Sequence, residues 1–236
     1  MIKNHEFNSI SVADGTELDA YIAIPGSDGK VPGIILLQEA FGVNHHIESI
    51  AERLCTEGYA VVAPDLFHRT INRLVVPYTN FSEAIPHYQA ITKEGLSFDF
   101  QAVYDWFQQQ DIINKDKIGS IGFCLGGRAS FLANARLPLA AGVSYYGGGL
   151  DQWTDEAENL YADHLFFWGG KDQHITAEVV ETIINAVKKA GKEYTNVVFS
   201  SADHGFHCDE RSSYHPLAAK EAWAHTLTFF ESRLKN

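Results

Sequence analysis

Residues 118–127 read IGSIGFCLGG, an apolar run that ends in a cysteine placed between glycines. Gly122, Cys124 and Gly126 stand at alternate positions and form the pattern G-x-C-x-G. Because residues 125–136 have a helical composition, the chain must turn from strand to helix within about two residues. Such a nucleophile elbow strains its central residue, and it needs the glycines because a Cβ there would collide with neighbouring backbone. The stretch therefore predicts a strand and a helix with Cys124 raised above the sheet between them.

Short apolar runs and helical patterns alternate along the rest of the chain. The apolar runs have the β-branched and aromatic composition of strands covered on both faces, and they lie at 33–38, 60–64, 117–123, 140–146, 164–169 and 195–201. Apolar stripes with helical spacing lie at 47–55, 179–187 and 223–234. This alternation predicts an α/β fold with a mostly parallel, twisted sheet and helices on both of its faces.

The N-terminal segment has a different pattern. Residues 7–12 and 18–24 alternate between apolar and polar, and the turn-forming pair Asp14-Gly15 separates them. We expect an antiparallel hairpin at one edge of the sheet. Segments 67–83 and 147–163 have weak periodicity, and we expect them to border the binding pocket, because ligands of such sheets bind beyond the carboxyl ends of the strands. Both are too short for a separate lid domain, so residues 1–236 are expected to form a single domain.

Composition excludes several classes of partner. The 236 residues carry a formal net charge of -12, whereas nucleic acids and anionic membranes bind basic patches. The cysteines at 55, 124 and 208 give neither a disulfide framework nor a zinc pattern, which favours a reducing compartment. The chain shows neither a signal-peptide core nor the roughly 18 consecutive apolar residues of a membrane helix. We expect a cytoplasmic protein that acts on a small-molecule substrate.

Cys124 alone is ambiguous, because cysteine is often simply a buried core residue. Two further residues decide the interpretation. Asp172 follows the strand predicted at 164–169, and His204 follows the last predicted strand, so both are expected at the same edge of the sheet as Cys124. The order nucleophile, acid, histidine is that of α/β-hydrolases. The backbone N–H of Leu125 would then stabilise an oxyanion at the start of the helix.

Five motifs together resemble the dienelactone hydrolase family: LLQEAFGVN at 36–44, APDLF at 63–67, IGFCLGGR at 121–128, GGKD at 169–172 and ADHGF at 202–206. The resemblance covers nearly the whole chain. It implies an α/β-hydrolase fold without a separate lid, a monomer without a cofactor, and a triad of Cys124, His204 and Asp172 that opens an enol lactone. It further implies that Glu39 holds or activates Cys124 and that the N–H of Ala40 is a second oxyanion donor. A carboxylate beside a thiolate is repulsive, so we expect a neutral thiol in the resting enzyme.

The chain departs from the family at one substrate-binding position. The family places an arginine four residues after the catalytic histidine, where this chain has Cys208, and Arg211 is our candidate replacement. A second family arginine falls near Arg69 and Arg73, and the sequence does not decide between them. Dienelactone itself is therefore a doubtful substrate.

Other site types receive less support. His204 and His207 have no carboxylate ligand pattern around them, so no metal site is predicted. Cys55 lies on an apolar helical stripe and is interpreted as core. Class I glutamine amidotransferases also use a cysteine elbow, but their histidine and glutamate stand two residues apart, a pattern that is absent after position 204.

The sequence thus predicts a cysteine-dependent hydrolase that opens a lactone or activated ester through an acyl-enzyme. Two alternatives stay open at this stage. One is a broader carboxylesterase or thioesterase with the same triad. The other is a redox-sensing or binding protein that keeps the fold without turnover.

Overall fold

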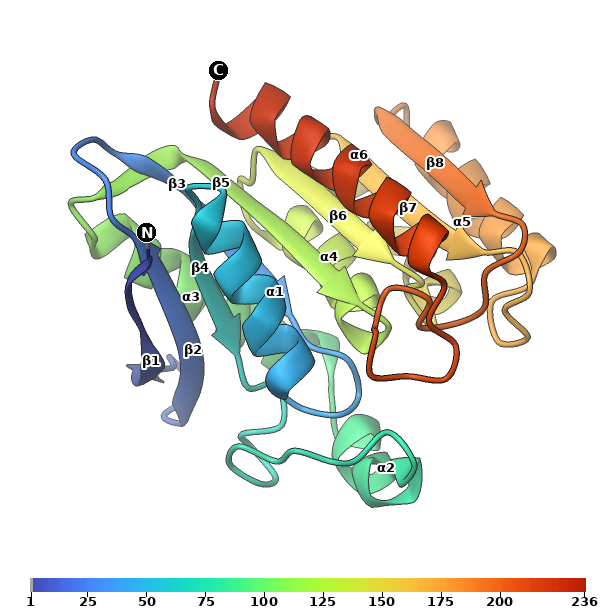
Figure 1. Cartoon of the computed structure of the whole chain (residues 1–236), viewed down its shortest axis with the longest axis horizontal. Coiled ribbons are helices and arrows are strands. Elements are labelled where there is room, and N and C mark those ends of the chain that lie inside the picture. Colours follow the sequence, from blue (N-terminus) through green and yellow to red (C-terminus); the bar gives the residue numbers. More distant parts are fainter. Residues whose placement is uncertain (1) are drawn as a thin grey trace.

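The computed structural model (Figure 1) describes the backbone of residues 2–236 and the side chains from residue 5 onward. One sheet of eight strands has the order β1-β2-β4-β3-β5-β6-β7-β8. The strands are β1 (Ile2–Ser11), β2 (Glu17–Pro25), β3 (Val31–Leu37), β4 (Ala60–Pro64), β5 (Ile113–Phe123), β6 (Ala141–Tyr145), β7 (His164–Gly169) and β8 (Tyr194–Phe199). The α-helices are α1 (His45–Thr56), α2 (Phe81–Gln89), α3 (Lys93–Gln109), α4 (Leu125–Arg136), α5 (Ala177–Lys189) and α6 (Pro216–Leu234). A 3₁₀ helix, η1 (Leu150–Asn159), lies between β6 and β7.

The predicted fold is confirmed. β1 pairs antiparallel with β2 as the expected edge hairpin, with Ser11 opposite Glu17 on either side of the turn. β2 is antiparallel to β4, and from β4 to β8 all neighbouring strands are parallel. Parallel strands end at the same edge, so the loops that follow β3, β5, β7 and β8 meet there.

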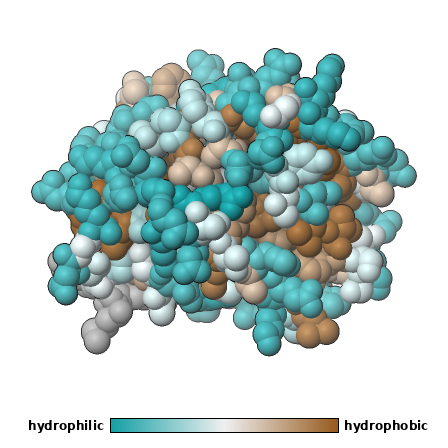
Figure 2. All heavy atoms as spheres, turned by 90° about the horizontal axis from the view of Figure 1, so that it is seen from above, coloured by the Kyte–Doolittle hydropathy of each residue, from teal (hydrophilic) through white to brown (hydrophobic). Residues whose placement is uncertain are grey.

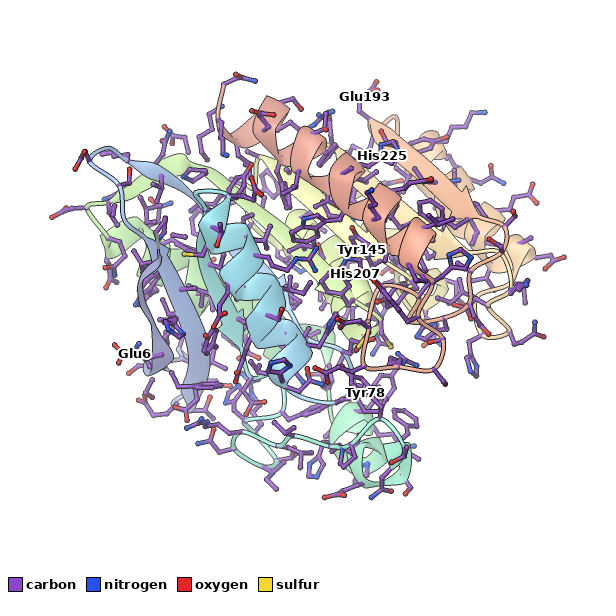
Figure 3. All side chains as sticks on the ribbon, viewed as in Figure 1. Glu6, Tyr78, Tyr145, Glu193, His207 and His225 are labelled. Atoms are coloured by element: carbon purple, nitrogen blue, oxygen red, sulfur yellow. The ribbon has the colours of Figure 1, made fainter. Side chains whose placement is uncertain are left out.

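Helices cover both faces of the sheet. In Figure 1, α1 and α6 lie in front of the strands, and α3, α4 and α5 lie behind them. Side chains along one strand alternate between two buried clusters: Ile34 and Leu36 of β3 belong to one cluster, and Ile35 and Leu37 belong to the other. Tyr145 and His207 lie side by side under α1 and α6, with ring centroids 5.1 Å apart (Figure 3). The site therefore rests on a sheet that is packed from both sides.

The prediction that the last strand is covered on both faces is wrong. β8 lies at the edge of the sheet, all its residues are exposed or partly exposed, and Val198 is 52% exposed. An edge strand has a neighbour on one side only, and local composition does not reveal which strand occupies the edge.

The two irregular segments contain short helices. α2 begins in the first segment, and η1 lies within the second. Both connect elements of the main sheet, and neither forms a separate lid. The face seen in Figure 2 is mostly hydrophilic, with hydrophobic side chains gathered in separate areas. In the part of the chain described here, no helix has the length and apolar character needed to cross a bilayer.

Candidate active site

The turn between β5 and α4 has the geometry of a nucleophile elbow. Cys124 has φ 54° and ψ -113°, a conformation that L residues rarely adopt. A Cβ at Gly122 would lie 1.9 Å from the carbonyl oxygen of Gly126, and a Cβ at Gly126 would lie 2.0 Å from that of Leu37. Both glycines are thus required by backbone contacts, as the sequence predicted. The surrounding backbone imposes this strained conformation and places Cys124 at the end of β5, where it is partly exposed.

The first turn of α4 supplies free N–H groups beside Cys124. Because α4 begins at Leu125, the N–H of Leu125 has no carbonyl partner within the helix. The helix dipole adds a partial positive charge at this end. Ala40, in the loop after β3, lines the same cavity as Cys124. The first turn of α4, with Leu125, and the loop after β3, with Ala40, therefore both lie beside Cys124.

Asp172 and His204 are brought together as predicted. Asp172 lies in the loop after β7, and its Oδ2 is 2.7 Å from Nδ1 of His204 in the loop after β8. The other carboxylate oxygen, Oδ1, accepts the backbone N–H groups of His174 at 2.8 Å and Ile175 at 3.0 Å. Burial acts to raise the pKa of Asp172, but the contacts with His204 and the two N–H groups lower it below its usual value. The carboxylate is thus fixed as an anion that orients the imidazole.

His204 also interacts with Cys124. Burial acts to lower the pKa of His204, but the charge of Cys124 and hydrogen bonds with Asp172 and Cys124 outweigh it and raise the pKa to about 10. A ring with this pKa holds its proton at neutral pH, so His204 lies beside Cys124 as an imidazolium.

A cavity of about 510 Å³ opens above Cys124 and His204. Its walls include the aromatic side chains of Phe41, Tyr78, Phe81 and Tyr88. Tyr78 and Phe81 come from the first irregular segment and the start of α2, and Gly148, Gly149 and Gln152 come from the second segment. Both segments thus border the pocket, as expected. A mostly apolar cavity with a few polar groups at its base suits a small organic ligand.

Comparisons with known proteins identify the family. A family model described as "Dienelactone hydrolase family" matches residues 18–234. The chain belongs to this family. A Yersinia pestis protein named "Putative carboxymethylenebutenolidase" is 35% identical over 229 residues, which are 92% of this chain and 85% of that protein. A Synechocystis protein of the same name is 33% identical and covers 93% of each chain.

Solved structures agree with this assignment. A Klebsiella pneumoniae structure titled "Putative Dienelactone Hydrolase" matches with a TM-score of 0.84 and 32% identity, over 97% of this chain and 99% of that one. A dienelactone hydrolase-like promiscuous phosphotriesterase from metagenomic libraries has a TM-score of 0.85 at 23% identity, over 97% and 98% of the chains, and shows the shared fold. The protein is a dienelactone hydrolase-like hydrolase that acts on lactone or ester bonds.

One of the three candidate arginines lines the cavity above Cys124 in this member of the dienelactone hydrolase family. Arg211 does so, and its Nη1 donates to Oε1 of the fully buried Glu39 at 2.9 Å. Arg69 pairs with Asp14 and Asp99 on another part of the surface, and the guanidinium of Arg73 stacks on Phe7. Arg211 thus reaches the site with its charge already paired.

Sequence reasoning missed Arg128. This side chain is only 8% exposed, and its guanidinium packs over the rings of Trp153 at 4.5 Å and Tyr88 at 5.1 Å. No carboxylate pairs with it among the side chains described, and its buried Nε has no hydrogen-bond partner. It lies behind Gly149, where a Cβ would be 2.8 Å from Nη1. Arg128 was part of a quoted motif, but nothing in the sequence indicated that its charge is unpaired.

The remaining cysteines are buried. Cys55 packs in the core on α1, as predicted. Cys208 is fully buried, and its thiol forms a hydrogen bond with the hydroxyl of Tyr78. Burial and the charge of Glu39 raise the pKa of Cys208 to about 12. The thiol of Cys208 is therefore buried and carries its proton at neutral pH.

Proposed function

We propose that this hydrolase opens a lactone or activated ester through an acyl-enzyme on Cys124, with His204 and Asp172 as the other members of the triad. The contact that supports this most is the 2.7 Å bond from His204 to Asp172, in a ring whose pKa is raised by Cys124. Because Asp172 occupies Nδ1, the other ring nitrogen is left for the cysteine and for substrate.

In the acylation step, the sulfur of Cys124 attacks the carbonyl carbon and the carbonyl electron pair moves to oxygen. The backbone N–H groups of Leu125 and Ala40 hold this oxyanion. When the carbonyl re-forms, the bond to the ring oxygen breaks, and His204 gives its proton to the departing oxygen. An enol lactone suits a thiol nucleophile, because its leaving group departs as a stabilised enolate and needs little help from proton transfer.

In the deacylation step, neutral His204 takes a proton from water as that water attacks the thioester. Collapse of the second oxyanion releases the carboxylic acid and returns Cys124 as a thiolate beside protonated His204. Asp172 keeps the imidazole in one orientation and stabilises its charged form throughout. No cofactor takes part in this scheme.

Glu39 and Arg211 are proposed to position the reacting groups. Glu39 is fully buried at the end of β3, and its ion pair fixes Arg211 at the cavity wall. Removal of Glu39 would free Arg211 and leave a partly buried cation without its partner, at a cost of about 3–5 kcal/mol. Arg211 is proposed to face the substrate, with Glu39 controlling how much of its charge is available.

The first test is turnover of a panel of enol lactones, saturated lactones, aryl esters and thioesters. Cys124→Ala should abolish hydrolysis of every substrate, whereas Cys55→Ala, a matched change at a core cysteine, should retain it. Undiminished turnover by folded Cys124→Ala would refute the proposal. Faster turnover of open-chain esters or thioesters than of lactones would favour a broader esterase. Reversible oxidation of Cys124 without hydrolysis of any substrate would favour a redox sensor.

We further propose that the protein works in the cytoplasm as a monomer of one domain on a small-molecule substrate. The cysteine pattern supports the reducing compartment, and the family resemblance supports a monomer that acts on a small molecule. Light scattering of the purified chain tests the oligomeric state, and a mass twice that of the chain would contradict it.

A further inference from the structure

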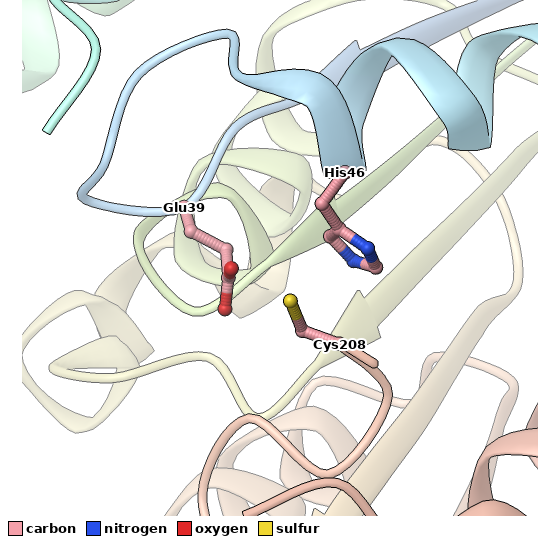
Figure 4. A group of neighbouring side chains, drawn as sticks. All are labelled: Glu39, His46 and Cys208. Carbon is pink, nitrogen blue, oxygen red and sulfur yellow. The ribbon is translucent and has the colours of Figure 1, made fainter. Parts of the chain in front are cut away.

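Three side chains that could hold a metal ion meet beside the proposed active site. Glu39 lies after β3, His46 in the first turn of α1 and Cys208 in the loop before α6. One ligand atom from each lies within 4.8 Å of the other two. The residues are 0%, 3% and 0% exposed, and Figure 4 shows their side chains pointing toward one another. The three groups therefore meet in the interior of the protein.

Two of the three have unsatisfied atoms. Oε2 of Glu39 and Nε2 of His46 are buried and form no hydrogen bond among the side chains described. A buried polar atom without a partner costs about 1–3 kcal/mol, and more when the group is charged. Oε1 of Glu39 already bonds Arg211, so Oε2 is free to accept a second positive charge. Glu39 and His46 thus each have a buried polar atom that is free to bind a further partner.

A neighbouring carboxylate orients the histidine. Oδ1 of Asp209 lies 3.7 Å from Nδ1 of His46, on the ring nitrogen opposite the unpaired Nε2. Histidines that bind metal commonly direct their second nitrogen to a carboxylate, which fixes the ring and makes the ligand nitrogen more basic. Asp209 thus stands where an outer-sphere partner of a metal site is expected.

The donor set fits zinc. Nitrogen, oxygen and sulfur ligands at about 2.0–2.3 Å from the ion are typical of Zn²⁺, whereas Mg²⁺ and Ca²⁺ prefer oxygen alone. Cys208 would bind as a thiolate and release its proton to solvent. The charges of one carboxylate and one thiolate then balance Zn²⁺. Three protein ligands leave a fourth position for water.

We propose that Glu39, His46 and Cys208 form a Zn²⁺ site beside the catalytic cavity. Tyr78 connects the two, because its hydroxyl bonds Cys208 and its ring lines the cavity. A bound ion on Oε2 would weaken the hold of Glu39 on Arg211, which is proposed to face the substrate, and so slow hydrolysis. This regulatory consequence rests on the proposed function, whereas metal binding itself does not.

Titration of the full-length, reduced protein with Co²⁺ tests the binding, since a cobalt–thiolate bond gives a charge-transfer band. We expect one Co²⁺ per chain with this band, displaced by Zn²⁺. Cys208→Ser should remove the band. His46→Gln should weaken binding by about 100-fold or more, since even outer-sphere partners contribute about 10–100-fold. Cys124→Ser and Cys55→Ser are matched controls that should keep the band, and circular dichroism checks that each variant folds.

Two results would overturn the site. One is a folded wild-type protein without the band. The other is a band that disappears in Cys124→Ser and persists in Cys208→Ser, which would place the metal on the catalytic cysteine. For the regulatory consequence, the ratio of hydrolysis rates with and without Zn²⁺ should be low in the wild type and return toward one in Cys208→Ser. An unchanged ratio in Cys208→Ser, with the band lost, would refute regulation through this site without affecting the triad.

Discussion

Replacing Cys124 by serine should lower the pKa of His204 strongly. In the wild type, burial pulls this pKa down, and the charge of Cys124 is the largest effect that raises it to about 10. Relative to an ordinary histidine at about 6.5, a pKa of about 10 corresponds to about 5 kcal/mol of preference for the protonated ring. A serine hydroxyl is neutral, so burial then opposes only Asp172. We expect the pKa to fall by at least about two units, equivalent to about 3 kcal/mol.

Histidine titration by NMR measures this change directly. His45 is an internal control, because its pKa is raised by Glu210 on the protein surface and should be the same in both proteins. A wild-type His204 that titrates near 6.5 would refute the interaction with Cys124 that raises its pKa. A pKa near 10 in both proteins would show that Asp172 alone maintains the charge, which would contradict the role assigned to Cys124.

Three further predictions concern other parts of the molecule. Gly126→Ala should prevent the elbow from forming and abolish activity, because its Cβ would lie 2.0 Å from a carbonyl oxygen, whereas Gly29→Ala meets no atom within 4 Å and should be neutral in activity and thermal unfolding. Burial lowers the pKa of His164 to about 3, below its unfolded value of about 6.5, so its contribution to stability is present above pH 6.5 and is lost as pH falls toward 3. Urea unfolding should therefore show a decline of up to about 1.4 kcal/mol per pH unit from this residue, and a His164→Asn variant with an equally steep decline would contradict the assignment. Arg128→Gln should raise KM for a negatively charged ester about tenfold or more relative to a neutral one, since a charge-assisted hydrogen bond contributes about 1.5–3 kcal/mol; equal changes for both esters would show that Arg128 only packs against the cavity wall.

The sequence predicted the elbow because its cause is local. Gly122 and Gly126 are required by contacts within a few residues of Cys124 and with the adjacent strand. Asp172 and His204 are far apart in the sequence, but both follow strands of one parallel sheet, and topology brings such positions to one edge. Strand order and motif position were therefore enough to anticipate that the residues of the proposed triad lie at one edge of the sheet.

Other features depend on tertiary contacts that no spacing encodes. The Glu39, His46 and Cys208 cluster joins the β3 loop to a segment more than 160 residues later, and no metal site was predicted there. Arg128 packs against aromatic rings and has no carboxylate partner among the side chains described, and only the tertiary structure reveals this. β8 has the apolar composition of a central strand and lies at the edge, because its position depends on the order of all eight strands.

Mass spectrometry of the reacting enzyme tests the covalent step most directly. The enzyme is mixed with a slowly hydrolysed lactone, quenched in acid and digested, and a His204→Ala variant is included to slow deacylation. We predict a thioester on the peptide that contains Cys124. Its added mass should equal the whole lactone, because the leaving oxygen stays attached to the acyl group. Hydrolysis that proceeds with this peptide unmodified, or with the acyl group on another residue, would contradict the account.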